Sequence, residues 1–371
     1  MANYDCRRRQ LGVNGILARV GLVGSNSRAM GRAILLCVAA GTLFAWLRLP
    51  LPWMLGPLLA MAIGKSSGLA LAAPPGSRQA GQLVIACALG LYFTPHIASE
   101  VITYLPWMLL SGVITVLTGF VGSAISRSLM GTTASGEPAL DRATAFFASM
   151  PGGAGEMAVL AERFGGRVDR VAFAQSFRIL LVVICIPFIY RYADIHGLDQ
   201  YTPVAGQAHA GSLAVLIGLA LAGAFLFMRF RAPNAFFLGP LAVVVGLTAS
   251  GVSSWAVPGW LSAAAQVCLG CALGAKFERD FFRAAPRFMF AVVVATVGAM
   301  AMALLYAWGL WQLAGIHPAS GVLAVAPGGI AEMCITAKVM QLGVPLVTAF
   351  HVARVVLLVS FSGVVYRRFV A

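Results

Sequence analysis

The stretch SMPGGAGEMAVLAERF at residues 149–164 has a second copy, VAPGGIAEMCITAKVM, at residues 325–340. The copies are offset by 176 positions, since 325 minus 149 is 176, and the same offset pairs Arg178 with Arg354. Shared segments at a fixed spacing are the signature of an internal repeat. The sequence therefore predicts a fold built from two copies of one unit.

A second pair of motifs extends the repeat toward the N-terminus. Leu55-Gly56-Pro57 recurs as Leu238-Gly239-Pro240. Gly and Pro inside an apolar helix indicate a kink or a close helix approach, so we expect Gly56, Pro57, Gly239 and Pro240 to act in packing or as hinges. A direct site role is the alternative. The predicted basic tail, first repeat, linker and second repeat span residues 1–32, 33–191, 192–210 and 211–368.

The composition identifies the class of protein. Of 371 residues, 60% are hydrophobic and 10% are charged, and the mean hydropathy is +0.88. A soluble domain carries roughly a quarter charged residues because it needs a wet surface. At roughly 20 apolar residues per span, the chain holds about ten crossings. We predict an all-α polytopic membrane protein, without a separate soluble domain.

The two Pro-Gly-Gly stretches decide the topology. They lie in apolar segments at 142–165 and 318–341, which either cross the membrane or enter it and return. Cytoplasmic loops are enriched in Lys and Arg. If both stretches are re-entrant, most of the 26 Lys and Arg fall on one side, whereas crossing stretches divide them about evenly. We therefore predict an inverted repeat of five transmembrane helices plus one re-entrant hairpin per half, with both termini and the basic tail cytoplasmic and the linker extracytoplasmic.

The same stretches are the candidate substrate site. Proline lacks an N–H donor and glycine tolerates unusual dihedrals, so a helix entering the motif should stop. A helix starting after the glycines would point free N–H groups at a cavity, as in inverted-repeat transporters. Close helix packing through Gly-Gly is the alternative. The residues expected at this site are Pro151, Gly152, Gly153, Gly155, Pro327, Gly328 and Gly329.

Charged and polar residues recur beside these motifs. Glu156 and Glu332 are equivalent acidic residues in apolar stretches, where carboxylates usually handle ions or protons. Arg178 and Arg354 lie deep in the last helix of each half, and each needs a carboxylate, carbonyl groups or an anionic substrate. Structural Glu–Arg pairing and direct anion contact both stay open. Three residues before the arginines are Gln175 and His351, which line the same face or serve in packing.

The sequence contains little that indicates an enzyme. The five histidines are scattered and form no metal-ligand pattern, the Cys268-x-x-Cys271 pair lacks a redox context, and the Gly-rich stretches match no nucleotide-binding motif. We expect no enzyme activity, no metal and no cofactor. We interpret the excess of 14 positive charges as a signal of membrane topology rather than of nucleic-acid binding.

These motifs resemble the AbrB family of bacterial membrane proteins, which is distinct from the soluble DNA-binding regulators of that name. The resemblance covers nearly the whole chain from about residue 33 and rests on both PGG-x-x-E-M elements, both LGP motifs and the arginine helices. It implies a location in the bacterial inner membrane. The labels attached to the family are ammonia monooxygenase and regulator of AidB expression, and no established catalytic residues come with them. At the level of fold, the pattern is also similar to elevator-type carboxylate and glutamate transporters.

Our leading hypothesis is a secondary transporter or exporter of a small anionic solute, coupled to H⁺ or Na⁺. Its partners are the bilayer and the solute, and homodimerisation stays open. The first alternative is a membrane sensor that influences gene expression indirectly. A subunit of an ammonia monooxygenase is the less favoured alternative.

Overall fold

The computed structural model describes residues 23–132, 139–197, 210–251, 255–277 and 286–370. All the named elements in these ranges are helices, as predicted from the composition. The helices of the first half are α2 (Val23–Trp46), α3 (Pro52–Ser66), α4 (Ser77–Gly90), α5 (Pro95–Thr103), α6 (Leu105–Met130), α7 (Arg142–Ser149), α8 (Ala154–Arg163) and α9 (Val168–Tyr192). Those of the second half are α10 (Ala210–Arg229), α11 (Ala235–Ala249), α12 (Gly259–Gly274), α14 (Pro286–Ala314), α15 (Pro318–Val325), α16 (Ile330–Val339) and α17 (Val344–Phe369).

Among the described residues, six helices are long and apolar enough to cross a membrane: α2, α6, α9, α10, α14 and α17. The α4–α5 pair, bent by 96°, is a seventh candidate as a broken span or a re-entrant loop. Helices α3, α11 and α12 are shorter, with 15, 15 and 16 residues. The predicted ten crossings are reached only if α3, α4–α5, α11 and α12 also cross, so that number stays a prediction.

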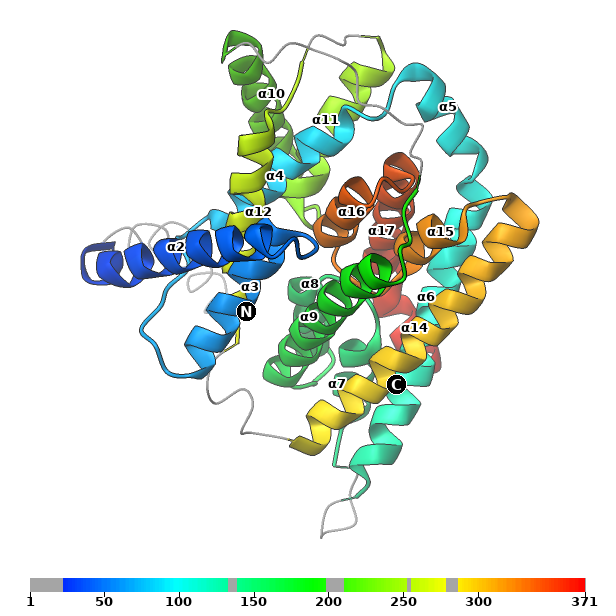
Figure 1. Ribbon diagram of the computed structural model, residues 1–371. Coiled ribbons are helices and arrows are strands. Elements are labelled where there is room, and N and C mark those ends of the chain that lie inside the picture. The colour runs from blue at the N-terminus through cyan, green and yellow to red at the C-terminus, as the bar shows by residue number, and fades with distance from the viewer. Residues whose placement is uncertain (1–22, 133–138, 198–209, 252–254, 278–285, 371) are drawn as a thin grey trace, which may run out of the picture.

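The helices gather into two bundles (Figure 1). Bundle I contains α2–α4 and α10–α12, and bundle II contains α6–α9 and α14–α17. Both bundles take corresponding helices from both halves of the sequence, which is the arrangement expected of interlocked repeats. Helix α5 comes directly after α4 in sequence. It contacts α11 of bundle I and α6 and α17 of bundle II, so it joins the two bundles.

Close glycine contacts hold bundle I together. A Cβ placed on Gly56 of α3 would lie 2.6 Å from the Ala40 carbonyl oxygen of α2. The equivalent Gly239 of α11 would meet the Gly223 oxygen of α10 at 2.4 Å. Neither position has room for a side chain. The structure therefore places the Leu-Gly-Pro glycines at helix contacts inside bundle I, with Pro57 and Pro240 inside the same helices.

Both Pro-Gly-Gly segments are folded back as hairpins. In hairpin 1 (142–163), the backbone N–H of Arg167, just after α8, donates to Thr144 Oγ1 in the first turn of α7 at 2.7 Å. In hairpin 2 (318–339), a Cβ on Gly343, just after α16, would lie 3.3 Å from Ser320 Oγ at the start of α15. The two ends of each segment thus meet, and the Pro-Gly-Gly motif forms the tip.

The hairpins open at opposite ends of α9. The base of hairpin 1 lies at Arg167, where α9 begins. Near the other end of α9, Tyr190 Oη donates to the Ala319 carbonyl at the base of hairpin 2, at 2.9 Å. The equivalent Tyr366, near the end of α17, packs its ring 5.1 Å from that of Phe147 in hairpin 1. The two tips therefore approach each other from opposite directions.

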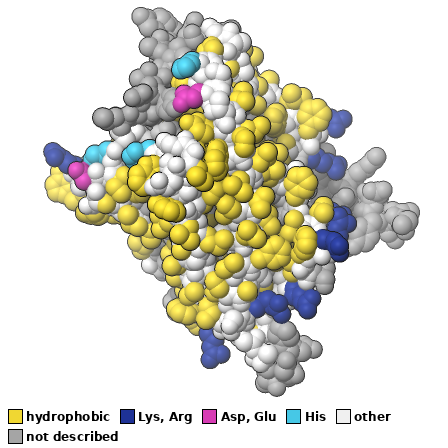
Figure 2. Space-filling view, turned by 90° about the vertical axis from the view of Figure 1, so that its right-hand side faces the viewer, with side chains coloured by type: hydrophobic (Ala, Val, Ile, Leu, Met, Phe, Trp, Pro, Cys, Tyr) yellow, Lys and Arg dark blue, Asp and Glu magenta, His cyan; other side chains and the backbone are white. Residues whose placement is uncertain are grey.

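The surface suits a lipid environment. Many large apolar side chains are exposed, including Trp46 at 78%, Leu305 at 69% and Trp260 at 68%. Figure 2 shows a broad apolar face with Lys and Arg side chains gathered along its lower right margin. An apolar belt bordered by charge is typical of multi-pass membrane proteins.

Candidate functional site

The two hairpin tips face a small cavity between the bundles. Its volume is about 50 Å³. Bundle II supplies the glycines of both tips and residues of α9 and α17, whereas bundle I supplies residues of α4, α11 and α12. Its polar and charged lining side chains are Arg78, Gln82, Asn234, Lys276, Glu332 and Arg354.

Arg178 on α9 is 4% exposed and joins both hairpins. Its Nη1 donates to the Ser149 carbonyl, in the last turn of α7, at 3.4 Å. Its Nε donates to the Pro327 carbonyl of the other tip at 3.1 Å. Gln175 orients the guanidinium, because Nη2 donates to Gln175 Oε1 at 2.6 Å.

Arg354 on α17 repeats this arrangement in the second half. It is 3% exposed, and its Nη1 donates to the Ala326 carbonyl at 2.7 Å, where α15 has ended. Nη2 donates to the Gly328 carbonyl at 3.1 Å and lies 2.8 Å from His351 Nδ1. One difference matters. Arg354 Nε is buried and has no hydrogen-bond partner among the described residues, whereas Arg178 Nε reaches the opposite tip.

Gln175 and His351 serve the same structural purpose. Gln175 Nε2 donates to the Phe147 and Met150 carbonyls at 2.7 and 2.8 Å. His351 Nε2 lies 2.9 Å from the Leu323 carbonyl. Both side chains are fully buried. They connect the arginine helices to the first arms of the hairpins, so they position the arginines and lie outside the cavity lining.

The arginines compensate for the helix breaks. A helix that ends inside the protein leaves carbonyl oxygens unpaired at the negative end of its dipole. The two guanidinium groups donate to those oxygens at the ends of α7 and α15. No ion pair joins either arginine to Glu156 or Glu332 in the described chain, so backbone carbonyls take the place of the Glu–Arg pairing considered from the sequence. The broken first arms are thereby stabilised beside the cavity.

The glutamates lie at the opposite side of each break. Glu156 and Glu332 are in the first turns of α8 and α16, whose N-caps are Gly153 and Gly329. Each carboxylate folds back over its N-cap glycine, so that a Cβ there would overlap the Glu Oε2 atom. A negative charge is favourable at a helix N-terminus. Each carboxylate therefore covers the positive end of its helix dipole.

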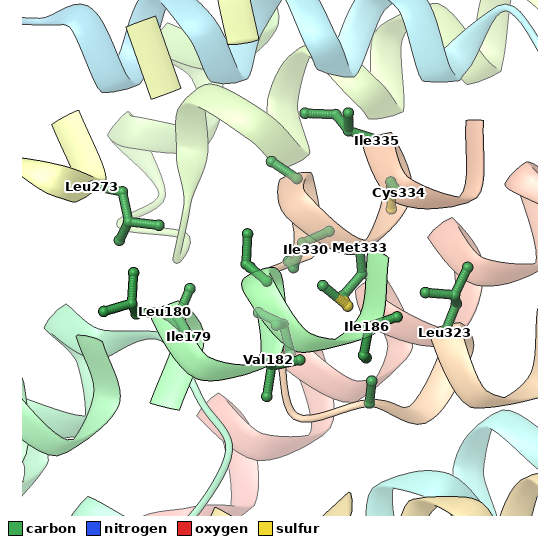
Figure 3. Packing of buried hydrophobic residues seen from close by; sticks show 14 of the residues in the cluster. Ile179, Leu180, Val182, Ile186, Leu273, Leu323, Ile330, Met333, Cys334 and Ile335 are labelled. Carbon is green, nitrogen blue, oxygen red and sulfur yellow. The ribbon is translucent and has the colours of Figure 1, made fainter. Parts of the chain in front are cut away.

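Apolar side chains form the remaining walls. Ile179 of α9, Leu273 of α12 and Ile330 of α16 line the cavity. Figure 3 shows these residues coming from three helices, with Met333 and Cys334 on the same helix as Ile330. An apolar wall lowers the local dielectric, which strengthens the attraction between a bound ion and nearby charges.

The structure brings together only part of the sequence-predicted set. Pro151, Gly152, Gly153, Gly328, Gly329, Glu332 and Arg354 line the cavity. Arg178 lies behind the tips, Pro327 lines a smaller void beside α6 and α14, and Gly155 is exposed. Glu156 folds back over Gly153 and is not among the lining residues. Gly56, Pro57, Gly239 and Pro240 are in bundle I, outside this lining.

Sequence reasoning missed four polar residues of bundle I: Arg78, Gln82, Asn234 and Lys276. The site residues expected from the sequence are charges that recur in both halves. These cations do not recur, since the offset of 184 that pairs Cys87 with Cys271 sets Ser262 against Arg78 and Lys276 against Tyr92. The signal that could have identified these two cations is that the equivalent position in the other repeat holds an uncharged residue.

The described residues offer no obvious metal site. No group of three or more His, Cys, Asp or Glu side chains in these ranges is arranged to hold an ion. The site consists of helix ends, two amides, three lining cations and one lining carboxylate.

Comparison with known proteins supports the family resemblance. The model of a family described as "Transition state regulatory protein AbrB" matches residues 53–370. A Bacillus subtilis (strain 168) protein named "Uncharacterized protein YhjN" is 28% identical over 370 residues, covering 90% of this chain and 91% of the relative. An Escherichia coli (strain K12) protein named "Putative regulator AbrB" is 25% identical over 329 residues, covering 86% of this chain and 91% of the relative.

Proposed function

The chain belongs to the AbrB family, and from that premise we propose that it is a secondary transporter of a small anionic solute, coupled to H⁺ or Na⁺, in the bacterial inner membrane. One observation carries the proposal: two broken hairpins from the two sequence halves meet at a cavity rimmed by their Pro-Gly-Gly tips. Broken helices meeting inside an apolar bundle are tolerated where they are buried in protein or line a water-filled cavity. Their exposed N-termini favour anionic substrate groups.

The glutamates supply the coupling in this proposal. Each carboxylate folds over the N-cap glycine of its helix and so competes with a substrate anion for the same helix end. Protonation, or a bound Na⁺, would neutralise that charge and favour entry of the anion. Solute and coupling ion therefore move together, because each makes the other's binding more favourable.

Alternating access follows from the two-bundle architecture. The cavity walls come from both bundles, so a displacement of bundle II against bundle I would change which side of the cavity is open. The opposite openings of the hairpins support an inverted repeat in the membrane. The basic margin supports a cytoplasmic face along that edge (Figure 2), and the proposal places both termini on the same side. In this arrangement ten helices cross and both hairpins are re-entrant.

Uptake by proteoliposomes tests the transport proposal. Labelled acetate, phosphate and sulfate are offered under an imposed H⁺ or Na⁺ gradient, with protein-free vesicles as background. We expect gradient-driven uptake by the wild type, a loss of about tenfold or more in Glu332→Gln, and a change within about twofold in Glu162→Gln. Glu162 is the matched control, because it is exposed in the last turn of α8. Uptake equal to background for every anion, or equal in all three proteins, contradicts the proposal.

A second candidate function rests on a relative's name. The Escherichia coli relative is named as a regulator, which favours a membrane sensor whose basic tail would be the output surface. Residues 1–22 of that tail lie outside the described structure. Deleting residues 2–29 separates the two functions, because a transporter keeps its uptake and a sensor loses its effect on gene expression. Transcript profiles of cells carrying the full-length and shortened chains give the second readout.

A further inference from the structure

We infer that Arg78, Lys276 and the free Nε of Arg354 form the seat for a compact oxyanion bound between the two bundles. This inference rests on the proposed function and specifies the substrate class at the same site. The ligand class is a small anion with one charged group, such as acetate, phosphate or sulfate. Binding there would connect bundle I to bundle II, because the cations come from both.

One buried donor of a cavity-lining residue lacks a hydrogen-bond partner among the described residues. Arg354 Nε is buried without a hydrogen-bond partner, although the rest of its guanidinium is fully engaged. A buried donor without a partner costs roughly 1–3 kcal/mol, so it is expected to have an acceptor when the protein works. Arg354 lines the cavity. A ligand oxygen in that cavity would be the missing acceptor.

The wall that bundle I contributes to the cavity carries positive charge. Arg78 at the start of α4 and Lys276 just after α12 line the cavity opposite the hairpin tips. Neither has a hydrogen bond or ion pair to another described residue. Lys276 is within electrostatic range of Arg78, Glu156 and Glu332. The three cations Arg78, Lys276 and Arg354 outnumber these two carboxylates, so the site carries a net positive charge that is stabilised when an anion binds.

The cavity is small. A water molecule needs roughly 10–15 Å³ of cavity volume, and the cavity has about 50 Å³. It therefore accepts an anion about as large as acetate or phosphate. The amides of Gln82 and Asn234 add neutral hydrogen-bonding groups, and the side chains of Ile179, Leu269 and Leu273 close the walls around this small volume. Selection by charge and by small size follows.

Equilibrium binding to the purified full-length protein tests the seat. The probes are acetate, phosphate, sulfate and hexanoate, measured by isothermal titration calorimetry. We expect at least one compact probe to bind, and hexanoate to bind about tenfold more weakly or worse than acetate if the seat takes carboxylates. A preference for acetate identifies the carboxylate class, and a preference for phosphate or sulfate identifies the tetrahedral oxyanions.

Substitutions assign the binding to the seat. We expect Arg78→Gln and Lys276→Gln each to lower the affinity for the bound probe about tenfold or more. We expect Lys276→Arg to keep most of the wild-type affinity. Matched controls are Arg163→Gln and Lys338→Gln, in the last turns of α8 and α16 and outside the cavity lining. Thermal unfolding of each variant checks that it is folded.

Two results would overturn the inference. One is affinity in the Arg78 and Lys276 variants equal to that in the controls. The other is gradient-driven uptake of an anion that binds without preference for small size. In both cases transport can persist, so the proposed function stands while the seat is wrong. Absence of both binding and uptake for all anions contradicts the two proposals together.

Discussion

At the residue scale, the arginines show what the sequence could and could not predict. Their depth in apolar helices predicted a need for partners, and the structure places backbone carbonyls around both. The sequence left carbonyls, carboxylates and substrate as open choices, because partner choice depends on where each hairpin ends in space. The sequence did not identify Arg78 and Lys276 as site residues, for another reason. Basic residues near helix ends look the same in sequence whether they mark the cytoplasmic side or line a cavity.

Replacing Arg354 by Lys should destabilise the protein. A single ammonium cannot contact Ala326, Gly328 and His351 together as the guanidinium does. At least one buried carbonyl would lose its donor, which costs about 1–3 kcal/mol. We expect a decrease in Tm of roughly 5 °C in detergent, measured by tryptophan fluorescence. The same Tm as wild type would show that these bonds contribute little.

Substituting Gly329 by Ala should affect function more than stability. The new Cβ overlaps the Glu332 carboxylate, which is the end of a flexible side chain and can move. We expect Tm to change by less than about 3 °C while gradient-driven anion uptake falls about tenfold. Gly309→Ala is the control, since a Cβ there meets nothing within 4 Å. Uptake equal to that of this control would show that the Glu332 carboxylate takes no part in coupling.

At the element scale, the sequence predicted the two hairpins but not how their tips meet in space. Pro151-Gly152-Gly153 breaks a helix by local chemistry, and the structure has α7 ending at Ser149 and α8 beginning at Ala154. The meeting of the two tips depends on contacts between residues about 176 positions apart, for which local patterns carry no information. The short helices α3, α11 and α12 also differ from the expected full-length spans. Their apolar runs continue into loops, which hydropathy alone does not separate from helix.

Glycine contacts between neighbouring helices predict a clear effect on stability. Gly239→Ala would put a Cβ 2.4 Å from the Gly223 carbonyl oxygen, so α10 and α11 must separate. We expect a loss of about 1–3 kcal/mol in stability, seen as a lower Tm. Gly246→Ala on the same helix is the control, because its Cβ meets no atom within 4 Å. Equal Tm values for the two variants would show that α10 and α11 adapt at no cost.

At the scale of the whole molecule, transport requires the bundles to move relative to each other. Ile179 and Leu273 line the cavity from bundle II and bundle I, respectively. We expect Ile179→Cys with Leu273→Cys, in a cysteine-free background, to be cross-linked by Hg²⁺ and to lose anion uptake until a thiol is added.

A pair within bundle II controls for the reagent. Ser126 Oγ and Ser149 Oγ are 3.5 Å apart, so Ser126→Cys with Ser149→Cys can be cross-linked inside one bundle. Uptake should continue after that cross-link. If the pair between bundles is cross-linked and uptake continues as before, the two bundles do not move against each other during transport.

Transport as proposed here requires an anion to bind between the hairpin tips, and a structure of the protein with a transported anion would show whether it does. We expect ligand density between Gly152 and Gly328, with an anionic oxygen within hydrogen-bonding distance of Arg354 Nε and the Glu332 carboxylate displaced from Gly329. Density for the transported anion elsewhere in the molecule, with Arg354 Nε still unpaired between the empty tips, would contradict it.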